Sequence, residues 1–260
     1  MTERYSVAVI TGGASGLGEG ATKHFLANNF KVAILDINED KAHEFIQSLP
    51  KAHQERTIFI KTNVTNEDQI EAAIDKAIQT FGQIHVVVNS AGIGYAELTY
   101  SKRRGVASSK KLIKNLGVNV VGTFNVCKHA ANRMKAQPVI SDTQDRGVLI
   151  NISSIMGIEA TSGFVSYAIT KGAVIGMTLP MARDLGKYKI RVLTVAPGLI
   201  QTPMNKNSPP DSFERNIKEA ALGRLSNPLE FGRFVYNVSH SSFLNGEVIR
   251  FDGAYRTPKI

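Results

Sequence analysis

The sequence predicts a single-domain α/β fold in which a parallel sheet of about seven strands is covered by helices on both faces. Short apolar, β-branched runs alternate with helical patterns along the whole chain. Neither a low-complexity linker nor an internal repeat interrupts them, and 260 residues suit one domain of this class. Strands that alternate with helices form parallel sheets through right-handed crossovers.

Seven apolar runs of strand length are predicted to form the sheet. They are Val7–Ile10, Lys31–Leu35, Thr57–Ile60, Ile84–Val88, Gly147–Ile152, Ile190–Val195 and Glu247–Arg250. Helical patterns include 19–28, 66–81 and 164–185, and a long polar segment spans 94–109. We expect residues 205–222 to form a flap with a short helix over the substrate site. The loop 138–147 is expected to shape the same pocket.

A glycine-rich turn, Thr11-Gly-Gly-Ala-Ser-Gly-Leu-Gly18, follows the first strand and leads into a helix. Gly12 would permit the tight turn, Gly16 would let the backbone approach a pyrophosphate, and Gly18 would allow close helix packing. The amides at the helix N-terminus would then bind the phosphates. A plain turn can show the same glycines, but the order strand, turn, helix favours dinucleotide binding.

Asp36 ends the second strand, 18 residues after Gly18. An acidic side chain there accepts hydrogen bonds from ribose hydroxyls and repels a 2′-phosphate. Ser15 and Ile37 stand where a chain that binds NADP would show a basic residue. The alternative is a turn residue that opens the next helix. The pattern favours NAD over NADP.

Tyr167 and Lys171 are four residues apart, and Ser154 precedes Tyr167 by 13 residues. Positions i and i+4 share a helix face, so the ammonium would lie beside the phenol and lower its pKa from about 10. A shift to pH 7 needs roughly 4 kcal/mol, which requires a partly desolvated site and a cationic cofactor ring. By itself the pair is more typical of an exposed helix surface.

The composition excludes several classes of protein. Cys127 is the only cysteine, so neither a disulfide framework nor a thiolate metal site is expected, and the six histidines show no metal-binding spacing. We expect no metal. No apolar run reaches the about 18 residues of a membrane span, and no membrane association is expected.

The net charge of +9 is partly concentrated in Lys102–Arg104 and the nearby Lys110, Lys111 and Lys114. Three interpretations remain open: a solvated face, a binding surface for an anionic substrate such as an acyl-CoA, and RNA contact. No aromatic interleaving supports RNA contact.

Several candidate segments fall where predicted strands end. They are Gly12–Gly18, Asp36, Asn89–Gly92, Ser154 and Pro197–Gly198. Ligands of parallel sheets bind beyond the carboxyl ends of the strands. This convergence indicates a Rossmann-like, doubly wound sheet with one ligand site.

In this order, the glycine loop, Asn89-Ser-Ala-Gly92, Ser154 and Tyr167-x-x-x-Lys171 resemble the short-chain dehydrogenase/reductase family over essentially the full length. Further stretches resemble a subgroup that acts on 3-hydroxyacyl-CoA and hydroxysteroids. These stretches are 176–185, 196–199 with Thr202-Pro203, 243–250 and 252–254.

The resemblance implies that Tyr167 exchanges the proton with the substrate oxygen, which Ser154 hydrogen-bonds. Lys171 would bind the nicotinamide ribose, and Asn119 would anchor a water that links Lys171 to solvent. Thr202 would orient the carboxamide. The expected NAD contacts are Gly12, Ser15, Gly16, Leu17, Gly18, Asp36, Asn63, Val64, Asn89, Ser90, Ala91, Gly92, Tyr167, Lys171, Pro197, Gly198, Ile200 and Thr202.

Two positions depart from the family pattern. Asn63 stands where Asp usually accepts from the adenine amino group, and we expect the amide oxygen of Asn63 to accept instead. Ser90 replaces the commoner Asn and should affect only fine geometry.

The resemblance also implies an NAD-dependent dehydrogenase of 3-hydroxyacyl-CoA, with hydroxysteroids as the second substrate class. It further implies a homotetramer with residues 252–260 near an interface. The expected location is the mitochondrial matrix, with the cytoplasm as the alternative. A non-catalytic role in a mitochondrial tRNA-processing complex is the remaining alternative.

Overall fold

The computed structural model describes residues 6–140, 144–202, 217 and 220–256. Seven strands form one sheet in the order β3-β2-β1-β4-β7-β8-β9, and every neighbouring pair is parallel. The strands are β1 Val7–Thr11, β2 Lys31–Asp36, β3 Thr57–Lys61, β4 Val86–Asn89, β7 Gly147–Ile152, β8 Ile190–Pro197 and β9 Val248–Phe251. The predicted seven-stranded parallel sheet is therefore confirmed.

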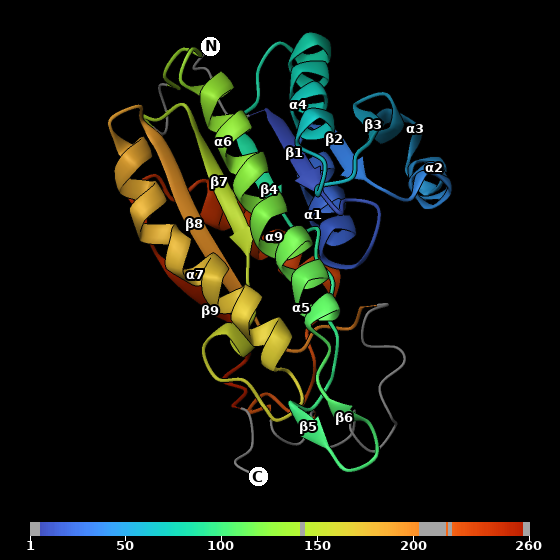
Figure 1. Cartoon of the computed structure of the whole chain (residues 1–260). Coiled ribbons are helices and arrows are strands. Elements are labelled where there is room, and N and C mark those ends of the chain that lie inside the picture. The colour runs from blue at the N-terminus through green and yellow to red at the C-terminus, as the bar shows by residue number, and fades with distance from the viewer. Residues whose placement is uncertain (1–5, 141–143, 203–216, 218–219, 257–260) are drawn as a thin grey trace.

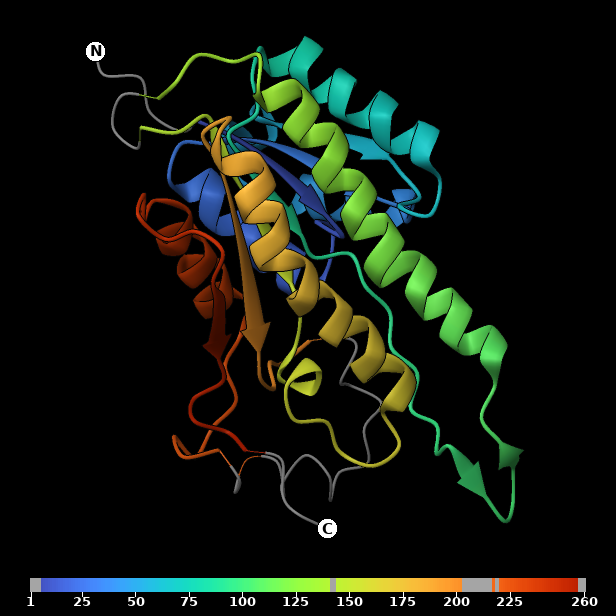
Figure 2. The same cartoon turned by 60° about the vertical axis from the view of Figure 1, so that its left-hand side comes forward.

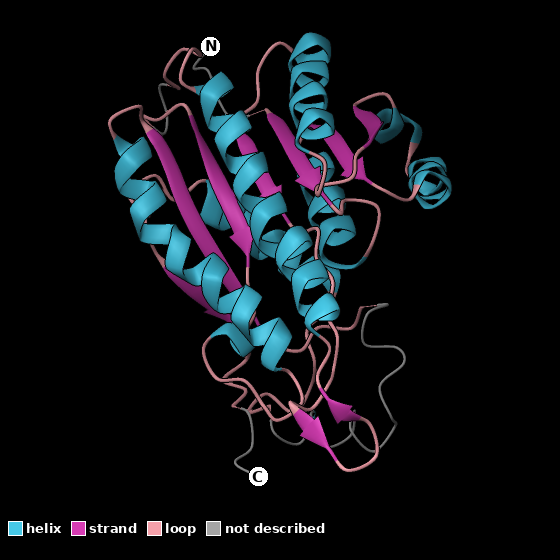
Figure 3. Ribbon diagram, in the orientation of Figure 1, coloured by secondary structure: helices cyan, strands magenta, loops and turns pink. Residues whose placement is uncertain are grey.

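Helices cover both faces of this sheet (Figures 1 and 3). One face packs against α1 Gly16–Ala27, α2 Glu39–Ser48 and α9 Pro228–Ser239. The other packs against α4 Glu67–Phe81, α6 Thr123–Met134 and α7 Val165–Gly186. The shorter elements are α3 Lys51–Gln54, α5 Ser109–Leu116, the π-helical segment η1 Gly117–Gly122 and the 3-10 turn η2 Ile155–Gly157.

The two cores arise because alternate side chains of a strand point to opposite faces. In β1, Ile10 packs in the cluster that contains Phe25 of α1, whereas Val9 packs in the cluster that contains Ile74 of α4. All four side chains are essentially inaccessible to solvent. Each such burial contributes about 1.5–3 kcal/mol, which explains why uniformly apolar runs form the central strands.

The register brings the strand ends to a common edge. Thr11 lies opposite Leu35 on one side and Asn89 on the other, and Asn89 lies opposite Asn151. The chain runs outward from β1 to β3 and then returns to place β4 on the other side of β1. The strand order thus reverses at β1, and ligand sites in such sheets form at this crevice.

The segment 94–109 is more ordered than a polar loop. It contains a small antiparallel hairpin, β5 Tyr100–Ser101 with β6 Gly105–Val106, which Figures 1 and 2 show beyond the carboxyl ends of the strands. Gly105 has φ +74°, a value that glycine tolerates without strain. Two-residue strands with exposed side chains carry no alternating pattern, so the sequence did not predict them.

One prediction about the substrate pocket is wrong. The loop 138–147 leads into the amino end of β7, at the opposite edge of the sheet from Ser154. There Asp145 forms a buried ion pair with Arg191, the second residue of β8. The expected flap at 205–222 lies largely outside the described residues. No helix in the described ranges has the length and apolarity needed to cross a membrane.

Candidate active site

The glycine turn fits tightly against the end of β4. Gly12 has φ +63°, and a Cβ there would lie 2.9 Å from the Cα of Ala91. A Cβ on Gly18 would lie 2.2 Å from the Gly12 carbonyl oxygen and 2.6 Å from Ser90 Oγ. The first turn of α1 is therefore pressed onto the glycine turn, as the sequence predicted, and neither position has room for a side chain.

The N-terminus of α1 offers free backbone donors. The helix begins at Gly16, and the first N–H groups of a helix have no intrahelical partners. Ser15 is the N-cap, but its side chain makes no capping hydrogen bond. Leu17 packs on the core beneath. These amides, together with the helix dipole, form a suitable site for an anionic group.

Asp36 bridges the glycine turn and the start of α2. Its Oδ2 accepts from the amide of Ala14 at 3.3 Å, and its Oδ1 accepts from the amide of Asn38 at 3.0 Å. The residue therefore does serve the turn before α2, and it also directs a carboxylate oxygen toward the glycine turn. The role as a turn residue is therefore observed, and the contact of Asp36 with a ribose stays a prediction.

Asn63 contradicts one expectation. Its Oδ1 accepts from the amide of Thr65 at 3.0 Å and from Thr65 Oγ1 at 2.8 Å. These two bonds use both lone pairs of the amide oxygen. The expectation that this oxygen accepts from an adenine amino group is therefore wrong for this structure. Val64, the next residue, is nearly buried.

The end of β4 ties the sheet to the glycine turn. Asn89 is 2% exposed, and its Nδ2 donates to Asn151 Oδ1 at 2.9 Å and to Cys127 Sγ at 3.2 Å. Ser90 Oγ donates to the Thr11 carbonyl at 2.7 Å. The side chain of Asn89 is thus committed to the core, and burial raises the pKa of the Cys127 thiol to about 12, consistent with a structural cysteine.

Tyr167 and Lys171 lie on one face of α7, as the spacing predicted. Lys171 Nζ is 5.5 Å from the centroid of the Tyr167 ring. The same ammonium donates to the Ile152 carbonyl at 2.8 Å, and Ser153 Oγ donates to the Lys171 carbonyl at 2.8 Å. The end of β7 therefore fixes the position of Lys171, which is only 5% exposed.

Burial dominates the proton affinities of this pair. It raises the pKa of Tyr167 to about 12, while a hydrogen bond with Ser154 acts to lower that pKa. It lowers the pKa of Lys171 to about 8. Ser154, 8% exposed, caps η2 by accepting from the amide of Met156 at 3.1 Å. The three side chains that the sequence singled out are brought together.

Asn119 lies in η1, and its side chain is fully engaged. Its Oδ1 accepts from the Ile93 amide at 2.9 Å, and its Nδ2 donates to the Ile93 carbonyl at 2.8 Å and to Thr170 Oγ1 at 3.0 Å. Thr170 in turn donates to the Tyr167 carbonyl at 2.8 Å. The sequence predicted neither partner, because their contact with Asn119 depends on the packing of η1 against α7.

Gly92 and Gly94 run past the same side chains. A Cβ on Gly92 would lie 3.3 Å from Asn119 Oδ1 and 3.6 Å from Lys171 Nζ. A Cβ on Gly94 would lie 3.2 Å from the Tyr167 ring. Glycine at these positions lets the loop after β4 pass close to the phenol and the ammonium. Gly94 was missed by the sequence analysis.

The end of β8 completes the edge. Gly198 donates its amide to the Phe251 carbonyl at 2.9 Å, and Ile200 forms an isolated parallel bridge with Ser226. Pro197 is buried, and Thr202 is partly buried. These residues lie at the carboxyl end of β8, next to the strand that leads to Ser154.

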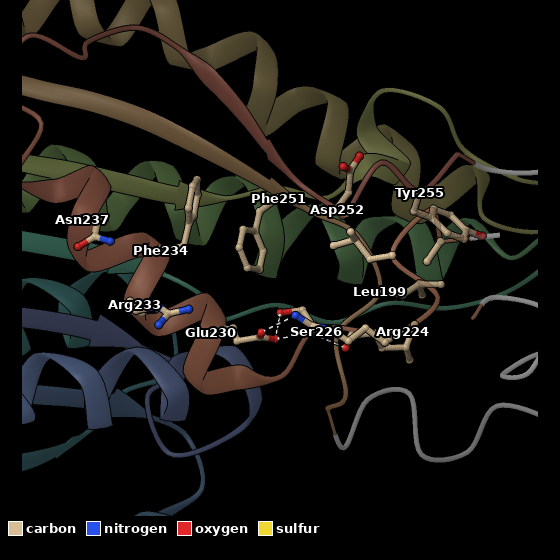
Figure 4. A pocket seen from close by; sticks show the side chains of 14 residues that line it. Leu199, Arg224, Ser226, Glu230, Arg233, Phe234, Asn237, Phe251, Asp252 and Tyr255 are labelled. Carbon is tan, nitrogen blue, oxygen red and sulfur yellow. Dashed lines mark hydrogen bonds and ion pairs between the residues drawn. The ribbon is translucent and has the colours of Figure 1, made fainter. Parts of the chain in front are cut away.

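A cavity of about 260 Å³ lies elsewhere, beside α9 and β9 (Figure 4). Phe234 and Phe251 stack at 4.7 Å within its wall, and Arg224 pairs with Glu230 at its rim. Asn119, Ser154, Tyr167 and Lys171 do not line it. Among the described residues, no cluster of three His, Cys, Asp or Glu side chains could bind a metal.

Lys171 carries a testable cost of burial. Its pKa is lowered from 10.5 to about 8, so below pH 8 the buried charge of Lys171 destabilises the folded chain by about 3 kcal/mol. Lys171→Met should stabilise the cofactor-free protein at pH 7 by about 1–2 kcal/mol, after about 1 kcal/mol is lost with the Ile152 hydrogen bond. Between pH 8 and 10.5 the unfolded wild-type chain binds more protons than the folded one, so wild-type stability rises with pH in this range. The stability advantage of Lys171→Met over wild type should therefore shrink. Urea unfolding of wild type and of Lys171→Met at pH 7 to 10 measures both free energies of unfolding.

The control for this prediction is Lys76→Met, which removes an exposed ammonium from α4. It should change stability by less than about 0.5 kcal/mol at every pH. A Lys171→Met protein that is less stable than wild type at pH 7, or whose advantage is independent of pH, would contradict a desolvated Lys171.

Comparison with known proteins agrees with this geometry. The family model described as short chain dehydrogenase matches residues 6–212. The chain is 40% identical to "3-hydroxyacyl-CoA dehydrogenase type-2" of Rattus norvegicus, covering 96% of this chain and 95% of the relative. Two solved structures are also similar. One is 3-hydroxyacyl-CoA dehydrogenase type-2 from Mycobacterium avium, with 32% identity, a TM-score of 0.89, and coverage of 98% and 97% of the two chains.

The other is "ElxO with NADP Bound", with 28% identity, a TM-score of 0.84, and coverage of 97% and 99%. The match of the family model spans most of the chain, and the rat relative is similar over nearly its whole length. The fold, the order of the motifs and the similarity to these proteins agree. The chain belongs to the short-chain dehydrogenase family and is an oxidoreductase.

Proposed function

We propose that this protein is an NAD-dependent dehydrogenase that interconverts 3-hydroxyacyl-CoA and 3-oxoacyl-CoA. The observation that carries the proposal is the convergence of Ser154, Tyr167 and Lys171 at the carboxyl edge of the sheet, beyond the end of β7. The name of the rat relative supports the substrate class.

The residues at the edge fit a dinucleotide. Gly12 and Gly18 leave no room for side chains, the first-turn amides of α1 have no intrahelical partners, and Asp36 presents a carboxylate beside them. The pyrophosphate would bind at the helix N-terminus and the ribose hydroxyls at Asp36. Bound NAD would supply the hydride acceptor and a positive charge near the phenol.

Tyr167 would accept the proton of the substrate hydroxyl during oxidation and return it during reduction. Ser154 would hydrogen-bond the same oxygen and orient it. Lys171, fixed by the Ile152 carbonyl, would favour the phenolate through its charge. Asn119 would keep the loop after β4 and the helix α7 in register through Ile93 and Thr170.

The direct test is a steady-state survey of 3-hydroxyacyl-CoA chain lengths and steroid alcohols, with NAD and with NADP. We expect NADH formation with the thioesters and a lower kcat/KM with the steroids. Turnover of steroid alcohols alone would favour the hydroxysteroid alternative. The absence of turnover with every alcohol would contradict the proposed activity.

Cofactor choice is tested at Asp36. Wild type should prefer NAD over NADP by more than tenfold in kcat/KM, because the carboxylate repels a 2′-phosphate. Asp36→Ala should reduce that preference by about tenfold or more, which corresponds to about 1.4 kcal/mol. Asp40→Ala removes an exposed charge from the first turn of α2 and should leave the preference unchanged. A wild-type preference for NADP would overturn the NAD assignment.

The hairpin favours an anionic substrate over a steroid. Lys102, Arg103 and Arg104 occupy its exposed turn, at the same end of the molecule as the carboxyl ends of the strands (Figure 2). The segment that leads into the hairpin is linked to the loop before α7 by the Glu97 amide, which donates to the Gly163 carbonyl at 2.6 Å. Coenzyme A carries several phosphate charges, whereas a steroid alcohol carries none.

Replacing Lys102, Arg103 and Arg104 together with Gln should raise KM for a CoA thioester by about tenfold. Each of the three exposed charge contacts contributes a few tenths of a kcal/mol to about 1 kcal/mol, so the loss of all three accounts for a rise in KM of about tenfold. The kcat should stay within twofold, and a pantetheine thioester, which lacks the nucleotide phosphates, should be unaffected. Lys76→Gln is the control. An unchanged KM for the CoA thioester would show that the hairpin does not contact it.

We also propose a homotetramer. Large apolar side chains remain exposed along the face formed by η1, α6 and α7, where these helices run side by side (Figure 1). They include Val121, Phe124, Val165, Ile169 and Leu179. An apolar face of this kind marks an interface. Light scattering should give four times the chain mass of 28.3 kDa. The mitochondrial matrix and a tRNA-processing role stay expectations of the family resemblance.

A further inference from the structure

The orientation of the Asn63 amide is determined by a backbone donor. The Thr65 N–H can only donate, and it lies 3.0 Å from the side-chain atom assigned as Oδ1 of Asn63. The oxygen must therefore face Thr65, where it also accepts from Oγ1 at 2.8 Å. The NH2 group points away from this turn.

That NH2 group lies at the nucleotide edge of the sheet. Asn63 lies two residues after the end of β3, and the intervening Thr62 donates its amide to the Asp36 carbonyl at 2.9 Å. Asn63 is partly buried, and Val64 beside it is 8% exposed. Within the described part of the chain, Asn63 Nδ2 donates no hydrogen bond, because both side-chain hydrogen bonds of this residue are made by Oδ1. Next to Asp36, the edge of the sheet thus presents the NH2 donor of Asn63 beside the apolar side chain of Val64.

The group at the six-position of a purine is a hydrogen-bond donor in adenine and an acceptor in hypoxanthine. Adenine presents an amino donor there, with the N1 acceptor beside it. Hypoxanthine presents the O6 acceptor, with an N1–H donor beside it. An amide NH2 can donate to N1 of adenine or to O6 of hypoxanthine, whereas a carboxylate can only accept and would repel O6.

We propose that Asn63 recognises the base of the dinucleotide as a hydrogen-bond donor, so that this protein binds 6-oxopurine and adenine dinucleotides with similar affinity. The inference rests on the dinucleotide site proposed above. A carboxylate in place of this amide would favour adenine, because at the six-position it accepts from the amino group and repels O6. Asn63 is then the residue that sets the base specificity of the cofactor site.

The test is equilibrium binding, without turnover, of NADH and of reduced nicotinamide hypoxanthine dinucleotide, followed by the fluorescence of the nicotinamide that both share. Wild type, Asn63→Asp and Asn66→Asp are compared. In Asn63→Asp the new carboxylate would still accept from Thr65, so the turn should survive. Asn66 caps α4 by accepting from Gln69, and Asp caps a helix equally well. Asn66→Asp therefore adds the same charge three residues away.

In wild type the two dissociation constants should differ by less than about fivefold. Asn63→Asp should shift their ratio toward NADH by at least about fivefold, the effect of one net hydrogen bond, and Asn66→Asp should not. A smaller shift for Asn63→Asp, or an equal shift for Asn66→Asp, overturns the inference while leaving the cofactor proposal intact. Binding of neither dinucleotide to wild type would overturn the cofactor proposal itself.

Discussion

Tyr167→Phe is expected to lower kcat by roughly a thousandfold with the best alcohol substrate, because general acid–base catalysis contributes about 10² to 10⁴ in rate. The phenol is a titratable group that lies beside both Ser154 and Lys171. Phenylalanine keeps the ring that packs against Gly94, so the site should retain its shape. The measurement is steady-state kinetics with an unchanged dissociation constant for NADH.

The pH dependence should identify the same group. Burial holds the pKa of Tyr167 at about 12, so the free chain has almost no phenolate at pH 7. We expect wild-type oxidation to speed up as pH rises, since the deprotonated phenol is the proposed base, and we expect this rise to vanish in Tyr167→Phe. Tyr100→Phe, in the exposed hairpin, should match wild type. Residual activity of Tyr167→Phe within tenfold of wild type would assign the proton transfer to another residue.

Gly20→Ala should be the most destabilising single-methyl change in the described chain that the structure suggests. Gly20 lies where α1 crosses α9, and a Cβ there would lie 1.9 Å from the Pro228 carbonyl oxygen and 2.4 Å from its carbon. The reciprocal contact is equally close, since a Cβ on Gly232 would lie 2.2 Å from the Gly20 carbonyl oxygen. Backbone faces backbone, so neither side can move away without shifting a helix.

We expect Gly20→Ala to lower the free energy of unfolding by about 3 kcal/mol or more, as overpacking against backbone does. Because α1 carries the amides at the proposed phosphate site, affinity for NADH should fall with it. Gly186→Ala, at the end of α7 with nothing within 4 Å, should instead be neutral or stabilising by up to about 1 kcal/mol. Equal urea midpoints for the two variants would contradict the tight helix crossing.

Local chemistry made much of this protein predictable. Runs such as Val7–Ile10 form buried strands because apolar, β-branched side chains suit a sheet that is covered on both faces. Tyr167 and Lys171 share a helix face because of their spacing alone. The glycine turn was predictable for the same reason, since its tight geometry depends on residues close together in sequence. Gly20 was not, because the reason for that glycine lies on α9, more than 200 residues away in sequence.

The sequence by itself therefore determined the parallel sheet, the edge at which its motifs converge, and the residues that we propose for proton transfer and dinucleotide binding. The tertiary structure alone decided which partners engage those side chains. It engaged Asn119 with Ile93 and Thr170, committed Asn89 to the core, and turned the Asn63 NH2 away from Thr65. Hydrogen-bond direction and desolvation depend on what packs around a group, and neighbours distant in sequence supply that packing.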